Sequence, residues 1–248
     1  MQNRDDIKGF YENFSSVLKH DLIYKNRRHI KHMIILGKIL RERSINSVLE
    51  IGTGVGVITE FLSKRIKEVK SIDISSNNLN IAKKHLNNNV TLIEGDILDL
   101  ELKGNFDLIL LLDVLEHIPK EKHTSVIKKI KRIMNPESLL VISIPNPYFL
   151  EFMSNKGFSL QIVDEKIFPK DIFKLCEIND MIIVSFMMFG IDYKNQYVMY
   201  QIENRTDEFE KLKKSETLKE RLMYKLYNNQ IVIFIRKIIW KFRTNGKF

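Results

Sequence analysis

Short apolar runs alternate with helical stretches along the middle of the chain. The runs with the length and character of buried strands are residues 48–51, 70–74, 90–94, 106–112 and 138–144. Between them, apolar residues recur at helical spacing, for example from Val57 onward and over residues 124–134. Strands that alternate with helices predict an α/β fold, in which a mostly parallel sheet carries helices on both faces.

The two ends of the chain depart from this alternation. In residues 30–40 the apolar positions fall at helical spacing, which predicts a helix packed on the sheet. Two further strands, at 181–188 and 196–202, are expected to pair antiparallel. We therefore predict a helical leader over residues 1–46, a main domain over 47–203, and a basic amphipathic helical extension over 204–248.

A glycine-rich turn, Gly52-Thr-Gly-Val-Gly56, links the first strand to the first helix of the main domain. Glycine lets the backbone turn tightly and approach a ligand where a Cβ would clash. Dinucleotide and nucleoside triphosphate sites use similar turns. However, Val57 stands where the dinucleotide fingerprint has its third glycine, and no Lys-Ser or Lys-Thr pair follows. Glu50, just before the turn, would repel a pyrophosphate and attract a cationic ligand.

Two more acids follow later strands. Asp73 ends the second strand about 20 residues after the glycines, where a carboxylate accepts the hydroxyls of a ribose. Asp96 follows the third strand and can accept a hydrogen bond from an adenine amino group. Because parallel strands end at the same edge of a sheet, Glu50, Asp73 and Asp96 are expected to meet there.

Together these segments resemble the class I S-adenosylmethionine-dependent methyltransferases. The matching motifs are Glu-Ile-Gly-Thr-Gly-Val-Gly at 50–56, Ser-Ile-Asp-Ile-Ser at 71–75, Glu-Gly-Asp-Ile at 94–97 and Leu-Asp-Val-Leu-Glu-His-Ile-Pro at 112–119. Ile-Pro-Asn at 144–146 resembles the subgroup that methylates small molecules, quinones and sugars. The resemblance implies a Rossmann-like sheet of seven strands in the order 3-2-1-4-5-7-6 and an S-adenosyl-L-methionine cofactor.

The resemblance also implies which residues bind this cofactor. It places Glu50 near the methionyl ammonium, Asp73 on the ribose and Asp96 beside the adenine. Arg27 lies where some quinone O-methyltransferases carry an arginine on the cofactor carboxylate, although a solvated arginine at a helix end is the alternative. The remaining residues that we assign to the cofactor site are Gly52, Thr53, Gly54, Gly56, Ile74, Ile97, Leu112 and Asp113.

Methyl transfer to oxygen requires a base for the hydroxyl proton. His117, just past the fourth strand, is the histidine expected at the ligand edge of the sheet and is our candidate catalytic residue. The alternative is that His117 braces the adenosine end of the pocket. We expect His29 and His32 to be surface or helix-packing residues.

Asp113, Glu116 and His117 are spaced so that they could converge on one divalent cation. Similar motifs bind magnesium in some ubiquinone-pathway and small-RNA methyltransferases. The RNA enzymes add a further histidine downstream, and His123 is too close to His117 to take that part. Because many relatives with Leu-Glu-His bind no metal, we assign no metal site.

Composition bears on the partners. The net charge of +9 fits an anionic partner such as RNA or a membrane surface, and it fits equally the composition of an AT-rich genome. Cys176 is the single cysteine, and the first residues are too polar for a secretory signal, which is consistent with a cytoplasmic protein. We expect a small-molecule or lipid-linked acceptor (a quinone, sugar or polyisoprenoid type) rather than a nucleic acid. A non-catalytic module that keeps the fold is the other alternative.

The last residues of the chain have the pattern of an amphipathic helix that binds a membrane surface. In residues 231–243 apolar side chains share one helical face and Arg or Lys residues flank it, with Trp240 suited to a headgroup region. This predicts peripheral contact of residues 229–248 with the inner face of the membrane. The alternatives are docking of this helix on its own domain or on a twin subunit in a homodimer.

Overall fold

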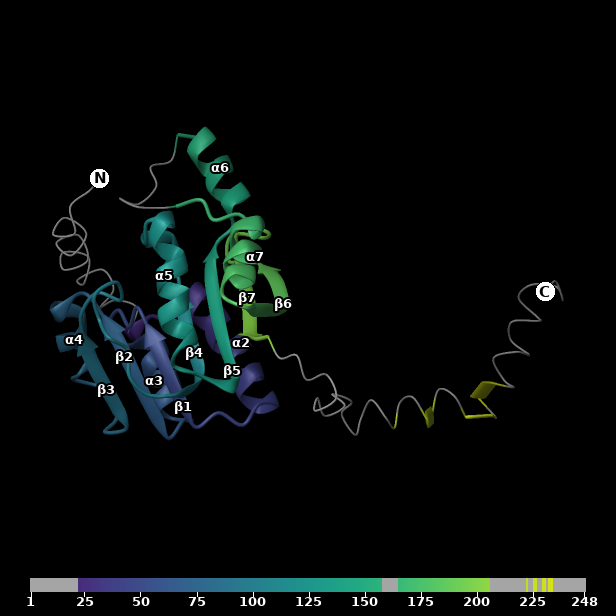
Figure 1. Ribbon diagram of the computed structural model, residues 1–248, viewed down its shortest axis with the longest axis horizontal. Coiled ribbons are helices and arrows are strands. Elements are labelled where there is room, and N and C mark those ends of the chain that lie inside the picture. The colour runs from purple at the N-terminus through teal and green to yellow at the C-terminus, as the bar shows by residue number, and fades with distance from the viewer. Residues whose placement is uncertain are drawn as a thin grey trace. The chain divides into compact units, whose positions relative to one another are not determined.

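The computed structural model describes residues 22–157 and 165–205 and, beyond them, residues 222, 225–226, 229–230 and 232–233. The chain divides into two compact units, Met1–Arg205 and Thr206–Phe248. The first unit contains the sheet and helices labelled in Figure 1. Residues 158–164, the first 21 residues and most of the basic extension lie outside the described residues.

A seven-stranded sheet forms the centre of the first unit, in the order β3-β2-β1-β4-β5-β7-β6. The strands are β1 (Ser47–Ile51), β2 (Glu68–Asp73), β3 (Val90–Glu94), β4 (Phe106–Leu112), β5 (Met134–Pro145), β6 (Met181–Phe189) and β7 (Tyr197–Asn204). The first five are parallel to one another, whereas β7 pairs antiparallel with both β5 and β6. The predicted strand order and the antiparallel pair are confirmed.

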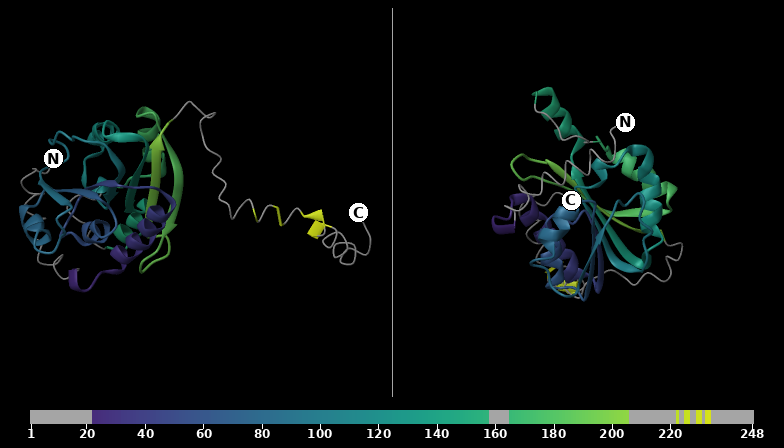
Figure 2. Two further views of the ribbon diagram at one scale, coloured as in Figure 1. Left: turned by 90° about the horizontal axis from the view of Figure 1, so that it is seen from below. Right: turned by 90° about the vertical axis from the view of Figure 1, so that its left-hand side faces the viewer.

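Helices cover both faces of this sheet, as predicted (Figure 2). They are α2 (Arg27–Glu42), α3 (Val57–Ser63), α4 (Ser76–Ala82), the short 3-10 helix η1 (Leu115–His117), α5 (Lys120–Lys131), α6 (Pro147–Asn155) and α7 (Pro169–Ile178). The helix predicted over residues 30–40 lies inside α2. It begins earlier because the Asn26 side chain accepts a hydrogen bond from the backbone N–H of His29 and so caps the first turn.

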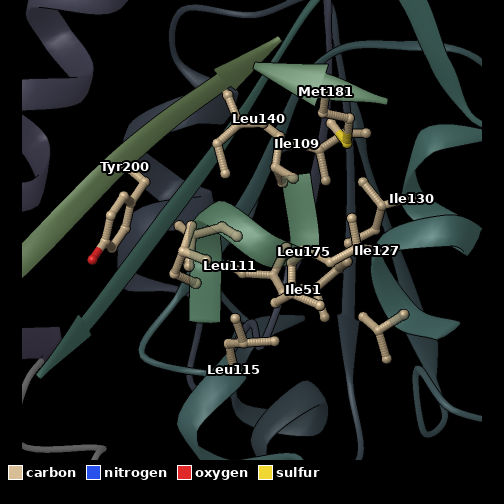
Figure 3. Close-up of a cluster of buried hydrophobic side chains, with 14 of the residues drawn as sticks. Ile51, Ile109, Leu111, Leu115, Ile127, Ile130, Leu140, Leu175, Met181 and Tyr200 are labelled. Carbon is tan, nitrogen blue, oxygen red and sulfur yellow. The ribbon is translucent and has the colours of Figure 1, made fainter. Parts of the chain in front are cut away.

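The sheet's side chains alternate between two cores. Leu49 and Ile51 of β1 face one core together with Ile127 of α5 and Leu175 of α7 (Figure 3). Val48, just before Leu49 in sequence, faces the other core with residues of α2 and α3. Because consecutive side chains of a strand point to opposite faces, a strand buried on both sides is apolar at most positions, with Glu50 as the exception in β1. This explains the continuous apolar runs.

Two element boundaries differ from the sequence prediction. Helix α5 starts right after Pro119 and ends at Lys131, several residues before Asn135-Pro136. Strand β5 begins at Met134, which pairs with Phe106, and the register then shifts before Leu139 pairs with Leu108. Pro136 lies in this irregular part, where its missing N–H breaks no regular ladder.

Candidate functional site

A cavity of about 410 Å³ opens at the carboxyl ends of β1, β2, β3 and β4. This is the edge at which parallel α/β sheets bind ligands. Most of the residues assigned to the site from sequence line it: Glu50, Gly52, Thr53, Gly54, Asp73, Ile74, Asp96, Ile97, Leu112, Asp113 and His117. Arg27 and Gly56 are not among the lining residues.

Two glycines of the turn have different structural roles. Gly52 has φ +87°, and a Cβ built on it would lie 2.4 Å from Cγ2 of Val114, so the turn packs directly on the segment that follows β4. Gly56, also at φ +87°, begins α3 without lining the cavity, and its Cβ would lie 3.0 Å from Cβ of Ala82 in α4. Gly56 therefore allows α3 and α4 to pack closely. Its position does not support its assignment to the cofactor site.

Glu50 is an acid placed almost out of reach of water. Its side chain lines the cavity wall, only 3% of the residue is exposed, and Oε2 accepts hydrogen bonds from Thr59 Oγ1 at 2.5 Å and Ser71 Oγ at 3.1 Å. Burial raises the pKa of Glu50 to about 7, since those two hydroxyls only partly offset the loss of hydration. Such a carboxyl ionises fully when a cation lies beside it.

The buried Glu50 predicts a pH-dependent stability for the ligand-free protein. Its folded-state pKa lies above the ordinary 4.5, so the folded chain holds a proton that the unfolded chain has already lost between pH 4.5 and about 7. The contribution of Glu50 to the free energy of unfolding therefore falls as the pH rises through that window. The variant Glu50→Gln should match the wild type near pH 4.5 and exceed it by about 3 kcal/mol at pH 8. Urea unfolding at several pH values measures this, and a difference that stays constant with pH would contradict it.

Asp73 is held by the turn that it faces. Its Oδ2 accepts the backbone N–H of Gly54 at 2.6 Å, and its Oδ1 accepts the N–H of Ser75 at 2.9 Å and Nδ2 of Asn78 at 3.3 Å. Burial raises its pKa, while these donors act in the opposite direction. The carboxylate is thus fixed at the cavity wall with its orientation set before any ligand arrives.

Some buried polar atoms at this wall have no hydrogen-bond partner among the described residues. They include Oγ1 of Thr53 and Oδ1 of Asn78, and both side chains belong to residues that line the cavity. Asp73 accepts from Asn78, which fixes Nδ2 toward the carboxylate and leaves Oδ1 as the open acceptor. Buried acceptors without donors are rare in native proteins, so the wall fits a ligand that carries hydroxyl groups. Asn78 was missed from sequence, although its place three residues after the helix cap Ser75 sets it in the first turn of α4.

The loop after β3 brings Asp96 and Ile97 to the cavity. Oδ1 of Asp96 accepts the N–H of Leu98 at 2.8 Å, and the carbonyl of Asp96 accepts the N–H groups of Asp99 and Leu100. This compact turn holds the backbone of Asp96 in one direction.

The arginine that lines the cavity is Arg28 rather than Arg27. Arg27 is largely exposed, and its Nη1 pairs with Asp192 at 3.0 Å. Arg28 lines the cavity, and its Nε lies 3.0 Å from Oδ2 of Asp113 at the end of β4. This ion pair, with a smaller contribution from Tyr197, holds the pKa of Arg28 above its ordinary value. Successive residues of a helix point about 100° apart, so the phase of α2 selects one arginine and turns the other outward.

Two histidines of α2 also line the cavity, besides His117 of η1. His32 is buried, its Nε2 lies 3.0 Å from Oγ of Ser143, and its ring meets Phe189 edge-on, so it packs as predicted and reaches the cavity as well. Burial lowers the pKa of His32 and lowers that of His29 to about 4, so both rings are neutral near pH 7. The sequence signal for this position was the spacing of three residues between His29 and His32, which places them on one face of a helix.

No group of three or more His, Cys, Asp or Glu side chains within the described ranges is arranged to hold a metal ion. Of the three residues considered for this role, Asp113 pairs with Arg28, and Glu116 is buried in η1. The cavity wall combines the Arg28–Asp113 ion pair and hydrogen-bonding side chains with apolar residues such as Ile58 and Ile72.

Comparison with known proteins shows which family this part of the chain resembles. Residues 48–137 match the methyltransferase domain family. The chain is 31% identical over 117 residues to the mitochondrial ubiquinone biosynthesis O-methyltransferase of Schizosaccharomyces pombe, which is 43% of this chain and 41% of that one. It is 32% identical over 111 residues to the malonyl-[acyl-carrier protein] O-methyltransferase of Priestia megaterium, or 44% of this chain and 40% of that one. The chain thus spans less than half the length of these curated relatives.

Solved structures share the fold. The magnesium protoporphyrin IX methyltransferase of Synechocystis with bound S-adenosylhomocysteine superposes with a TM-score of 0.63 at 17% identity, over 82% of this chain and 100% of that one. An S-adenosylmethionine-dependent methyltransferase from Clostridium acetobutylicum gives 0.62 at 15% identity, over 78% and 99% of the two chains. Residues 48–137 thus form a methyltransferase domain, and the described fold is that of the class I S-adenosylmethionine-dependent methyltransferases.

Proposed function

We propose that the protein methylates a hydroxyl group of a small-molecule or lipid-linked acceptor, with S-adenosyl-L-methionine as the donor. The observation that carries the proposal is the buried Glu50 at the cavity wall, beside the glycine turn and in line with Asp73 and Asp96. A carboxylate in this place suits a ligand with a positive charge and disfavours a phosphate. That the curated relatives are named as O-methyltransferases supports oxygen as the acceptor atom.

The residues present fit this cofactor. Glu50 would attract the methionyl ammonium, Asp73 and the open acceptors of Thr53 and Asn78 suit ribose hydroxyls, and Asp96 suits the adenine amino group. When bound, the cofactor supplies an electrophilic methyl group on a sulfonium. The chain's part is to hold the acceptor oxygen close to that carbon and in line with the bond that breaks.

On the acceptor side, we propose His117 as the base that takes the hydroxyl proton. It lines the cavity beside the end of β4, close in sequence to Asp113. His29 and His32 line the same cavity, but burial lowers the pKa of both, which makes them weaker bases near neutral pH. In this role His117 would take the proton that the acceptor hydroxyl gives up when it is methylated.

Calorimetry with S-adenosylhomocysteine tests the proposal first. The purified chain should bind it with one site, and extracts from the source cell should then yield an acceptor that gains labelled methyl. If no binding is seen, the proposed function is wrong. Binding without transfer to any extract component would instead favour the non-catalytic module.

The two arginines at the start of α2 provide a matched pair of variants. Arg28→Gln removes a cation from the cavity and leaves the Asp113 carboxylate without its ion pair, so S-adenosylhomocysteine should bind about tenfold more weakly. Arg27→Gln removes an exposed cation outside the cavity, so this variant should bind S-adenosylhomocysteine as tightly as the wild type. Calorimetric titration of both variants measures this. Equal losses in the two would contradict the assignment to Arg28.

We also propose peripheral membrane contact through residues 229–248, which would bring the protein to the inner face of the membrane. The support is the amphipathic and basic sequence of this segment, most of which lies outside the described residues. Within the described part of the chain, no helix is long and apolar enough to cross a membrane. Sedimentation with anionic liposomes should decrease when residues 229–248 are deleted. If binding is unchanged and the full chain is dimeric, the segment would belong to a twin-subunit contact instead.

A further inference from the structure

Lysine 129 of α5 reaches across to the loop that follows β3. Its Nζ donates hydrogen bonds to three backbone carbonyls, those of Ile97 at 3.2 Å, Leu98 at 2.5 Å and Leu100 at 3.2 Å. A lysine ammonium has three N–H donors, so this contact uses all of them. The side chain is only partly exposed, and its charge is directed at protein carbonyls that would otherwise converge with no donor between them.

The loop that Lys129 holds follows an edge strand of the sheet. It leaves β3, which has β2 as its single neighbour in the sheet. Leu98 and Leu100 pack partly buried against the core, and Leu100 covers Gly95 so closely that a Cβ there would lie 2.8 Å from it. Within the loop, Oδ1 of Asp96 accepts the N–H of Leu98, and the Asp96 carbonyl accepts those of Asp99 and Leu100. Lys129 adds a polar contact that joins this turn to α5, a helix packed on the core.

We propose that Lys129 is a positioning residue for the base-recognising end of the cofactor site. By fixing the carbonyls of residues 97, 98 and 100, it fixes the direction in which the Asp96 carboxylate meets a bound base. The inference rests on the proposed function, in which Asp96 accepts a hydrogen bond from the adenine amino group. The ammonium also offsets the negative ends of three carbonyl dipoles beside that carboxylate.

A second lysine on the same helix provides the control. Nζ of Lys131 donates to the carbonyls of Asn179 at 2.5 Å and Asp180 at 3.0 Å, in the turn between α7 and β6. None of these three residues lines the cavity. Lys131→Met thus removes the same kind of contact from the same helix without touching the site. Any effect that both lysine variants share reports loss of stability alone.

The test compares S-adenosylhomocysteine with S-inosylhomocysteine, in which a carbonyl oxygen replaces the adenine amino group. A site built to accept from an amino group rejects the analogue that lacks it, so the wild type should prefer the adenine ligand by about tenfold or more. Lys129→Met should bind S-adenosylhomocysteine about tenfold more weakly and lose most of the preference. Lys131→Met should keep both the affinity and the preference.

The outcomes separate the two proposals. If the wild type binds neither ligand, the proposed function fails. If the wild type binds and Lys129→Met keeps the wild-type preference, whether or not its affinity falls, the positioning role is overturned. Should Lys129→Met fail to fold, Lys129→Gln retains two donors and is measured in the same way, with an intermediate preference expected.

Discussion

Replacing Asp73 with alanine is expected to weaken the binding of S-adenosylhomocysteine by tenfold or more, about the worth of a charge-assisted hydrogen bond. The carboxylate lines the cavity and is oriented by three donors, among them the N–H of Gly54 in the glycine turn. Its loss removes the acceptor proposed for the ribose, and it also releases the turn that surrounds the ligand. Calorimetric titration measures the affinity, and urea unfolding measures the stability of the variant.

Asp107 offers a control of the same chemistry at the opposite end of the sheet. Its carboxylate also accepts backbone hydrogen bonds, from Asn46 at 2.8 Å and Ser47 at 3.0 Å, at the start of β1 and β4. Asp107→Ala should lower the free energy of unfolding and leave the affinity of the folded protein unchanged. If Asp73→Ala behaves in the same way, its assignment to the ribose is wrong.

The second large effect is expected from Gly52→Ala. The new Cβ would meet Cγ2 of Val114 at 2.4 Å, and the backbone at φ +87° is one that L side chains rarely adopt. The left-handed conformation costs about 1–2 kcal/mol, and the overlap adds about 1–3 kcal/mol, so a loss of about 2–5 kcal/mol in the free energy of unfolding is expected. Displacement of the turn should also abolish detectable binding of S-adenosylhomocysteine.

Two further variants separate these contributions. Gly157 has φ +79° with nothing within 4 Å of a Cβ, so Gly157→Ala should show the backbone cost alone. In the double variant Gly52→Ala/Val114→Ala the overlap is removed, and part of the lost stability and binding should return. Urea unfolding and calorimetry of the set measure both. If the double variant were as impaired as Gly52→Ala, the contact with Val114 would not be the cause.

Sequence patterns predicted the sheet and its strand-end acids because these depend on local regularities. Continuous apolar runs mark strands buried on both faces, and parallel strands bring their carboxyl ends together, so Glu50, Asp73 and Asp96 meet at one cavity. The strand order itself was implied by the family resemblance, and these positions follow from that order and from the parallel pairing of the strands.

The parts that were missed depend on helix phase and on contacts between distant segments. Arg27 was named from the family resemblance, with a solvated arginine at a helix end as the alternative, because the sequence does not fix which side of this helix faces the cavity. The Asn26 cap decides this in the folded chain. Nζ of Lys129 contacts backbone carbonyls that lie about 30 residues earlier in the sequence. No periodic pattern of residues predicts such a contact.

Helix α2 has a consequence for the size of the functional unit. The segment that matches the methyltransferase family starts at residue 48, yet Arg28, His29 and His32 line the cavity from before it. On the other side, Ser143 of β5, which contacts His32, lies beyond the end of the match at residue 137. The matched segment therefore supplies the glycine turn and the strand-end acids, whereas α2, which precedes it, supplies another wall of the cavity, and Ser143 contacts that wall through His32. A fragment reduced to residues 48–137 would lack this wall.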